Sequence, residues 1–321
     1  MKLPPLKIGE YVASVPIVQG GMSIRISTGK LAGAVAGAGG IGVIGASGMT
    51  FDELREEIKI ARELAKGGIV AINILFAAKD FLGIVEAALN AGIDIIFSGA
   101  GFSRDIYKMV ENTRTVFVPI VSSARLALLA AKLGAKAVVV ESKEAGGHLG
   151  TDRPIRDILP EVVAAMKGKN IPVIAAGGLC DGCDIVEMFK MGASGAQLST
   201  IFIRTPECNA ADEYKNVHLN ANIDDVILIR SPVGLPGRAI KTKLVADMDN
   251  GYYPPIEFCD DCLKNCGKEY CIFDVLKKAQ VGDVDNGIVF SGENVYRLKK
   301  EIIPAAQIIK NLVREADLCE E

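Results

Sequence analysis

Residues 138–150 read VVVESKEAGGHLG, and this stretch is one unit of a pattern that runs through the chain. Its β-branched residues, followed by Glu141, predict a buried strand that ends there. The loop that follows carries Gly146, Gly147 and His148, and its glycines allow backbone and ligand to come close. Imidazole titrates nearest neutral pH, so His148 is a candidate general acid or base. The alternative is a loop histidine that only caps a helix or binds a carbonyl group.

Outward from this stretch, eight apolar strands are expected, and a helix is expected after each of the first seven. Strands are expected at residues 16–19, 41–44, 69–74, 94–98, 116–121, 137–141, 172–176 and 195–198. Helices are expected at residues 28–38, 51–66, 80–90, 103–111, 122–133, 155–166 and 184–191. Apolar strands that each precede an amphipathic helix are typical of a parallel sheet covered on its outer face. Eight units favour an α/β fold of the TIM (β/α)8 barrel type, with an open doubly wound sheet as the alternative.

The amino-acid composition limits the kinds of molecule that this protein is expected to bind. The chain has 321 residues, 50% hydrophobic and 23% charged, with a net charge of −3, which argues against nucleic acid. No apolar run approaches the roughly 18 residues of a membrane span, and the first residues lack the apolar region of a signal peptide. We therefore expect a cytoplasmic protein without a membrane partner. In that compartment the eight cysteines predict thiols or metal ligands before disulfides.

Glycine and polar residues follow most of the expected strands. In a (β/α)8 barrel these strand ends meet on the face that carries the chemistry. They include Gln19-Gly20-Gly21, Asn73, Ser98 to Gly101, Gly146-Gly147-His148 and Gly177-Gly178. Backbone N–H groups at Gly177-Gly178 and after the eighth strand, at Ser199 and Thr200, could hold a dianion without a cationic side chain. This pattern indicates a phosphorylated ligand, for which flavin mononucleotide (FMN) is the natural candidate.

Five segments carry a family resemblance: PIVQGGM at 16–22, AINI at 71–74, ESKEAGGHLG at 141–150, VIAAGGL at 173–179 and GASGAQLSTIF at 192–202. They resemble the FMN-dependent nitronate monooxygenases, also called 2-nitropropane dioxygenases, a family that includes flavin-dependent enoyl-ACP reductases. The resemblance covers about residues 4–204. It implies FMN bound by Gly20, Gly21, Met22, Asn73, Gly147, Gly177, Gly178, Gln197, Ser199 and Thr200, with His148 as base or proton donor.

The chain departs from the family pattern at two places. Ser199 stands where the family usually has Gly, and Cys180 and Cys183 form a C-x-x-C loop beside the expected phosphate site. These two thiols are either a redox pair or a chance pair.

The resemblance implies an oxidoreductase that oxidises nitronates or nitroalkanes with O2. The alternative is an enoyl-thioester reductase that takes electrons from NAD(P)H and accepts substrate from an acyl carrier protein. A non-catalytic flavin- or metal-binding redox sensor is a hypothesis from another class. A phosphosugar isomerase on the same barrel would bind no flavin.

Three regions are expected: a barrel at 1–204, a lid at 205–290 and a C-terminal region at 291–321. The lid contains SPVGLPGR at 231–238, which predicts an ordered excursion rather than a helix. Its Arg238 either meets an anionic substrate or lies in a surface turn. Apolar spacing over residues 294–316 predicts a helix that packs on the barrel or on a second subunit of a homodimer.

The lid also contains Cys259, Cys262, Cys266 and Cys271, spaced C-x2-C-x3-C-x4-C. This spacing predicts a four-thiolate site for a [4Fe–4S] cluster or Zn²⁺, with free thiols or disulfides as the alternative. Cys208 and Cys319 are expected to be ordinary free thiols.

Overall fold

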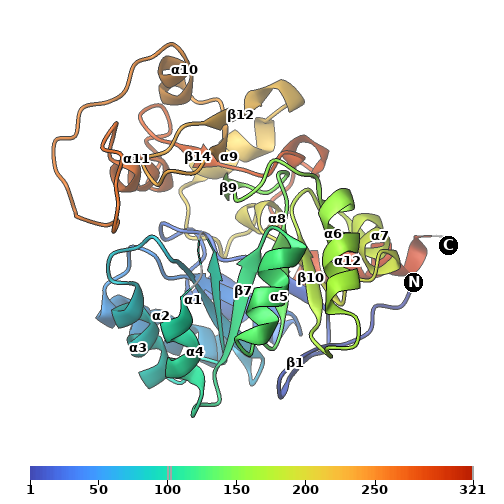
Figure 1. Cartoon of the computed structure of the whole chain (residues 1–321). Helices are drawn as coiled ribbons and strands as arrows, with labels where there is room; N and C mark the ends of the chain where they lie inside the picture. Colours follow the sequence, from blue (N-terminus) through green and yellow to red (C-terminus); the bar gives the residue numbers. More distant parts are fainter. Residues whose placement is uncertain (100, 102, 320–321) are drawn as a thin grey trace.

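The computed structural model describes residues 1–99, 101 and 103–319; the strand-end position expected at Ala100 lies outside them. Eight parallel strands close into a barrel, which confirms the expected fold and rules out the open sheet (Figure 1). Strand β11 pairs with both β10 and β3, and this closes the ring. The barrel strands are β3 (Ile17–Gln19), β4 (Ile41–Gly45), β5 (Ile69–Leu75), β6 (Ile95–Gly99), β7 (Val116–Val121), β8 (Val138–Glu141), β10 (Val173–Ala176) and β11 (Gly195–Leu198).

Apolar side chains of the strands fill the barrel interior, and the helices cover its outside. The hairpin of β1 (Leu6–Ile8) and β2 (Tyr11–Ala13) packs its buried residues against the first residues of the strands, so it closes the N-terminal end. The outer helices are α1 (Gly29–Gly37), α2 (Phe51–Ala65), α3 (Phe81–Asn90), α4 (Arg104–Val110), α5 (Ala124–Lys132), α6 (Ile155–Met166) and α7 (Gly182–Lys190). Each lies close to its expected position. Thr50 and Glu53 form the capping box that begins α2.

A second lobe covers the C-terminal mouth of the barrel (Figure 1). Its sheet consists of β12 (Val226–Ile229), β13 (Gly237–Ile240) and β14 (Val289–Phe290), and β9 (Gly147–His148) pairs with β13. Its helices are α9 (Asp212–Asn220), η1 (Ile223–Asp225), α10 (Lys243–Asp249) and α11 (Ile272–Gln280), and the short α8 (Thr200–Ile203) links it to the barrel. Residues 231–238 form no helix, as expected, whereas the wider lid region contains several.

Two expectations about this region are wrong. Arg238 does not lie in a surface turn: it is buried in β13, and its guanidinium donates to the carbonyl oxygen of Lys143. The C-terminal helix does not begin near Asn294, because only the short η2 (Val295–Arg297) precedes α12 (Ala305–Leu318). Buried Arg204 donates to the carbonyls of Val295, Leu298 and Lys299, so these groups are taken up outside a helix.

Helix α12 packs on the barrel rather than projecting from it. Its buried Ile308, Leu312 and Ala316 share a core with Leu31 of α1 and Ile185 of α7. Within the described residues, no helix combines the length and the apolar character needed to cross a membrane.

Candidate functional site

Two adjacent cavities lie at the barrel mouth. The larger, of about 240 Å³, lies between the strand ends and the lobe. The smaller, of about 60 Å³, adjoins it and shares Glu141, Gly146, Gln197, Ser199 and Thr200 as lining residues. The structure brings most of the expected site residues to these cavities. The larger is lined by Gly21, Met22, Asn73, Gly147, His148, Gln197, Ser199 and Thr200, and the smaller by Gly177 and Gly178.

Gly20 is the exception, since it lines neither cavity. Its N–H donates to the carbonyl of Leu198, and a Cβ there would collide with the Ser199 hydroxyl. The glycine therefore allows the ends of β3 and β11 to pack closely, and its contact with a flavin stays a prediction.

Asn73 gives the larger cavity an unused polar group. Its Nδ2 donates to the carbonyl of Gly21 at 3.3 Å, whereas its buried Oδ1 has no partner among the described residues. Gly21 is needed beside it, because a Cβ at this position would collide with the Cβ of Asn73. A buried acceptor without a partner costs free energy, so a ligand that donates a hydrogen bond would satisfy it.

His148 belongs to the lobe sheet as well as to the barrel loop. Strand β9 pairs with β13 in the register His148 to Gly237. The ring packs edge-on against Phe290, with centroids 5.1 Å apart, and Nε2 lies 2.8 Å from Oγ of Ser231. Burial lowers the pKa of His148 to about 4, so the imidazole is neutral at pH 7. Nδ1 has no hydrogen-bond partner among the described residues, so it is the nitrogen that can exchange a proton with a ligand.

The other histidine has a structural position. His218 is fully buried in α9, and its two ring nitrogens face the carbonyls of Tyr214 and Phe290. It lines neither cavity.

The smaller cavity is built from backbone. Gly177 and Gly178 have φ values of +106° and +75°, and a Cβ on Gly178 would lie 3.0 Å from Cβ of Glu144 and 3.2 Å from Nδ2 of Asn294. That amide donates to the carbonyl of Gly178 at 2.8 Å. No Lys or Arg lines this cavity among the described residues. An anion would therefore depend on backbone and hydroxyl donors, as the sequence predicts.

Glu141 is a site residue that the sequence reasoning missed. Its side chain lines both cavities, and burial raises its pKa to about 7. Its position in the sequence could have revealed this role, because a carboxylate at the C-terminal end of a barrel strand lies on the catalytic face. At the junction of the cavities, this group can accept hydrogen bonds from hydroxyls of an extended ligand.

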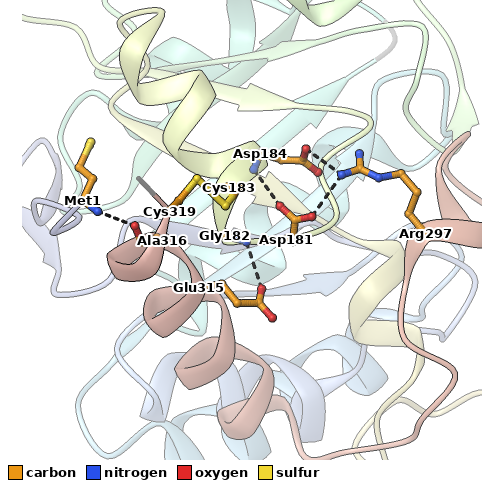
Figure 2. The surroundings of a disulfide bond; sticks show 9 residues. All are labelled: Met1, Asp181, Gly182, Cys183, Asp184, Arg297, Glu315, Ala316 and Cys319. Carbon is orange, nitrogen blue, oxygen red and sulfur yellow. Dashed lines mark hydrogen bonds and ion pairs between the residues drawn. A yellow bond between two sulfur atoms is a disulfide. The ribbon is translucent and has the colours of Figure 1, made fainter. Parts of the chain in front are cut away.

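The loop that forms the smaller cavity is held from outside by the C-terminal region (Figure 2). Arg297 forms ion pairs with Asp181 and Asp184 at the start of α7, and Asp184 also accepts the N–H of Cys180. The N–H of Gly182 donates to Glu315 of α12. Together these contacts fix the direction in which the loop leaves β10.

The cysteines around this loop differ from the expectation. Cys183 and Cys319 form a disulfide with their Cα atoms 5.4 Å apart. Cys180 and Cys183 are therefore a chance pair rather than a redox pair, and the expectation of a free Cys319 is wrong. Cys180 is a buried thiol that donates to the carbonyl of Asn294, and burial raises its pKa to about 12. Cys208 is free and buried, as expected. The C-x-x-C spacing was misleading because the partner of Cys183 lies 136 residues away.

Removal of the disulfide is expected to destabilise the protein. Cys183→Ser should lower the free energy of unfolding by about 2–4 kcal/mol, because the bond restricts a long loop in the unfolded chain. Thermal unfolding with and without a thiol reductant measures the effect. Reductant should lower the Tm of the wild type and leave that of Cys183→Ser unchanged. Equal Tm values for reduced and unreduced wild type would contradict the bond.

The four lid cysteines lie in residues 251–271, between α10 and α11. All four are free, and Cys262 lines the larger cavity. No three Cys, His, Asp or Glu side chains of the described residues converge closely enough to hold a metal ion. The metal centre expected from their spacing thus remains a prediction.

Comparison with known proteins assigns the chain to a family. A family model described as nitronate monooxygenase matches residues 5–315. A (3aS,4S,5R,7aS)-5-hydroxy-7a-methyl-1-oxo-octahydro-1H-indene-4-carboxyl-CoA dehydrogenase of Mycobacterium tuberculosis is 31% identical over 238 residues, which are 74% of this chain and 66% of that protein. This chain thus matches just under two thirds of the length of that relative. A probable nitronate monooxygenase of Staphylococcus saprophyticus is 24% identical over 99% of both chains. The structure of FabK from Thermotoga maritima has a TM-score of 0.83 at 29% identity, over 95% of this chain and 93% of that one.

Proposed function

The chain belongs to the nitronate monooxygenase family, a family of oxidoreductases, and on that premise we propose that it is an FMN-dependent enzyme that reduces 2-enoyl thioesters with NAD(P)H. The observation that carries this choice is the wall of the larger cavity. The lobe contributes an apolar surface of Val233, Leu263, Ile272, Phe273, Leu276 and Phe290, and no Lys or Arg lines the cavity among the described residues. An acyl chain would pack on this apolar wall. A small nitronate anion would have no cationic side chain among the described residues to pair with. The carboxyl-CoA dehydrogenase relative supports the same substrate class.

The two cavities fit the parts of FMN. The larger would take the flavin ring, with Gly21 and Met22 beside it and the partnerless Asn73 Oδ1 as acceptor for a ring N–H. Glu141, at the junction, would accept hydrogen bonds from the polyol hydroxyls. The smaller would take the phosphate against Gly177 and Gly178. When bound, FMN supplies the transfer of two electrons from NAD(P)H to the substrate.

His148 would assist the proton transfer to the substrate. The net reaction adds a hydride to the β-carbon of the enoyl thioester and a proton to its α-carbon, while NAD(P)H becomes NAD(P)⁺. Because His148 is neutral at pH 7, it is too weak an acid to give up its own N–H. The proton for the α-carbon would instead come from a water molecule oriented by Nδ1, which has no partner among the described residues, and bulk solvent would replace that proton. Ser231 fixes the ring through Nε2.

Oxidation of nitronates with O2 is the second candidate. The observation that favours it is the match of the Staphylococcus saprophyticus protein over 99% of both chains. A nitronate resembles the enolate of a thioester, because both are planar carbanion equivalents beside an oxygen-bearing group. The same His148 could therefore remove the α-proton of a nitroalkane.

The two functions separate in a paired assay on FMN-loaded protein. Crotonyl-CoA with NADH or NADPH is supplied without oxygen, and propyl-2-nitronate is supplied with oxygen and no nicotinamide. The proposal predicts oxidation of NAD(P)H in step with loss of the enoyl absorbance, and little oxygen uptake with the nitronate. Nitronate-dependent oxygen uptake without any reduction of crotonyl-CoA would reject the thioester and support the second candidate.

The ionisation of Glu141 is expected to set the pH dependence of FMN binding. With its pKa raised to about 7, the side chain is a neutral acid below that pH and a carboxylate above it. The added negative charge lies beside the phosphate cavity, so FMN affinity should fall as the pH rises through about 7. Glu141→Gln removes the titration and should flatten the profile above pH 7, as measured by fluorescence titration. A fall of the same size in the variant would show that another group is responsible.

Ser231 is expected to act by positioning His148. Ser231→Ala removes one hydrogen bond to Nε2 and should lower kcat by about 3–10-fold, the value of one such bond, with little change in FMN affinity. Ser231→Thr keeps the hydroxyl and should restore most of the rate. A merely structural role would instead appear as loss of flavin or of stability in Ser231→Ala without a fall in kcat.

A further inference from the structure

The lid segment at residues 251–271 has almost no regular secondary structure, and part of it lines the larger cavity. It contains no helix and one isolated β-bridge, yet it carries four of the eight cysteines of the chain. Figure 1 shows this part of the chain as a long loop beside α11. Loops of this length inside a compact lobe usually serve a function or are held by some other constraint.

The middle of the segment is fixed to the barrel. Leu263 forms the bridge with Ala78, the N–H of Lys79 donates to the carbonyl of Cys262, and the N–H of Lys264 donates to the carbonyl of Ala77. Cys262 and Leu263 also line the larger cavity. The segment therefore forms part of the wall that would face substrate, and its closure affects the shape of that cavity.

The backbone around the cysteines makes tight turns. Asp261, directly before Cys262, has φ +50°, and Lys268, two residues after Cys266, has φ +60°. Left-handed conformations cost roughly 1–2 kcal/mol per residue for side chains other than glycine, so they need compensation. Few hydrogen bonds within the segment supply it, and none of the four thiols is used in a disulfide.

The four thiols lie within thirteen residues of the chain. Cys271 is the N-cap residue of α11, so its backbone position is set by the start of that helix. Cys259 and Cys266 are exposed, whereas Cys262 and Cys271 are half-buried.

We propose that Cys259, Cys262, Cys266 and Cys271 bind one thiophilic metal centre, an iron–sulfur cluster or Zn²⁺, which closes the lid segment against the cavity. The C-x2-C-x3-C-x4-C spacing supplies the four thiolates that either centre requires. The thiols do not converge on one point in the structure, so the exposed pair must move toward Cys262 and Cys271. Such movement is normal, because binding of a metal and folding of its loop are one equilibrium. Binding of metal by these thiols does not depend on the proposed reaction at the flavin cavity, so the two proposals are tested separately.

Metal analysis of the whole chain, purified without oxygen, tests the site. The expected result is about four irons with sulfide, or one zinc, per chain. The double variant Cys262→Ser/Cys266→Ser should lose that metal, whereas Cys208→Ser, which removes a free thiol outside the segment, should keep it. Iron with sulfide and zinc both support the site and distinguish the two centres.

Limited proteolysis gives a readout that does not depend on activity. The metal-loaded wild type should resist cleavage within residues 251–271, and the double variant should be cut there while its barrel stays intact. Far-UV circular dichroism checks that the variant is folded. Metal at background level after reconstitution with iron and sulfide and, separately, with Zn²⁺ would overturn the proposal. Equal metal content in the wild type and a folded double variant would do the same.

Discussion

His148→Gln is expected to lower the turnover of enoyl thioester by about 10²–10⁴-fold while the protein keeps its flavin. Glutamine can retain a hydrogen bond to Ser231 and the contact with Phe290, but it cannot exchange a proton. Because burial lowers the pKa of His148 to about 4, the wild-type ring stays neutral as the pH falls from 7 to 5. Protonation of His148 should thus limit the rate only near pH 4, well below the ordinary range for histidine. Steady-state kinetics across this pH range measure both effects.

His218→Gln is the matched control for the only other histidine. His218 is buried between two carbonyls and lines neither cavity, so this variant should lose stability rather than turnover per folded molecule. Retention of wild-type turnover by flavin-loaded His148→Gln would contradict the assigned role.

Gly178→Ala should weaken FMN binding by about 10–100-fold, which corresponds to one or two lost hydrogen bonds to a charged group. The residue has φ +75°, where a side chain is strained, and the new Cβ would press on Glu144 and on the Asn294 amide that holds this loop. The backbone donors of the smaller cavity would move as a result. Fluorescence titration of the apoprotein with FMN measures the change.

Gly168→Ala separates backbone strain from damage to the site. Gly168 has φ +77°, nearly the same as Gly178, but a Cβ there would meet nothing within 4 Å. It should cost stability and leave FMN affinity unchanged. If both variants bound FMN as tightly as the wild type, the phosphate would not lie against Gly178.

The sequence allowed the barrel and most of its rim to be predicted, because both follow from local patterns. Each strand is a short apolar run that ends in glycine or a polar residue, and parallel strands bring those ends to one face. Gly21, Asn73, Gln197 and Gly178 could thus be placed near one another without knowledge of the tertiary contacts.

The missed features depend on contacts between distant segments. Strand β9 has only two residues and acquires its conformation from β13, so no periodic pattern reveals it. The pairing of Ser231 with His148 and that of Cys183 with Cys319 likewise join parts of the chain that the sequence does not relate. The start of α12 shifted because the carbonyls of Val295, Leu298 and Lys299 accept hydrogen bonds from Arg204 rather than from a helix.

The most direct test of the account is to compare the affinities of the apoprotein for FMN and for riboflavin. The two ligands differ only in the phosphate, which the account places in the backbone-lined cavity at Gly177 and Gly178. The predicted result is yellow protein that binds FMN at least tenfold more tightly than riboflavin, with the difference largely lost in Gly178→Ala. Equal affinities for the two ligands, or no binding of FMN at all, would contradict the account.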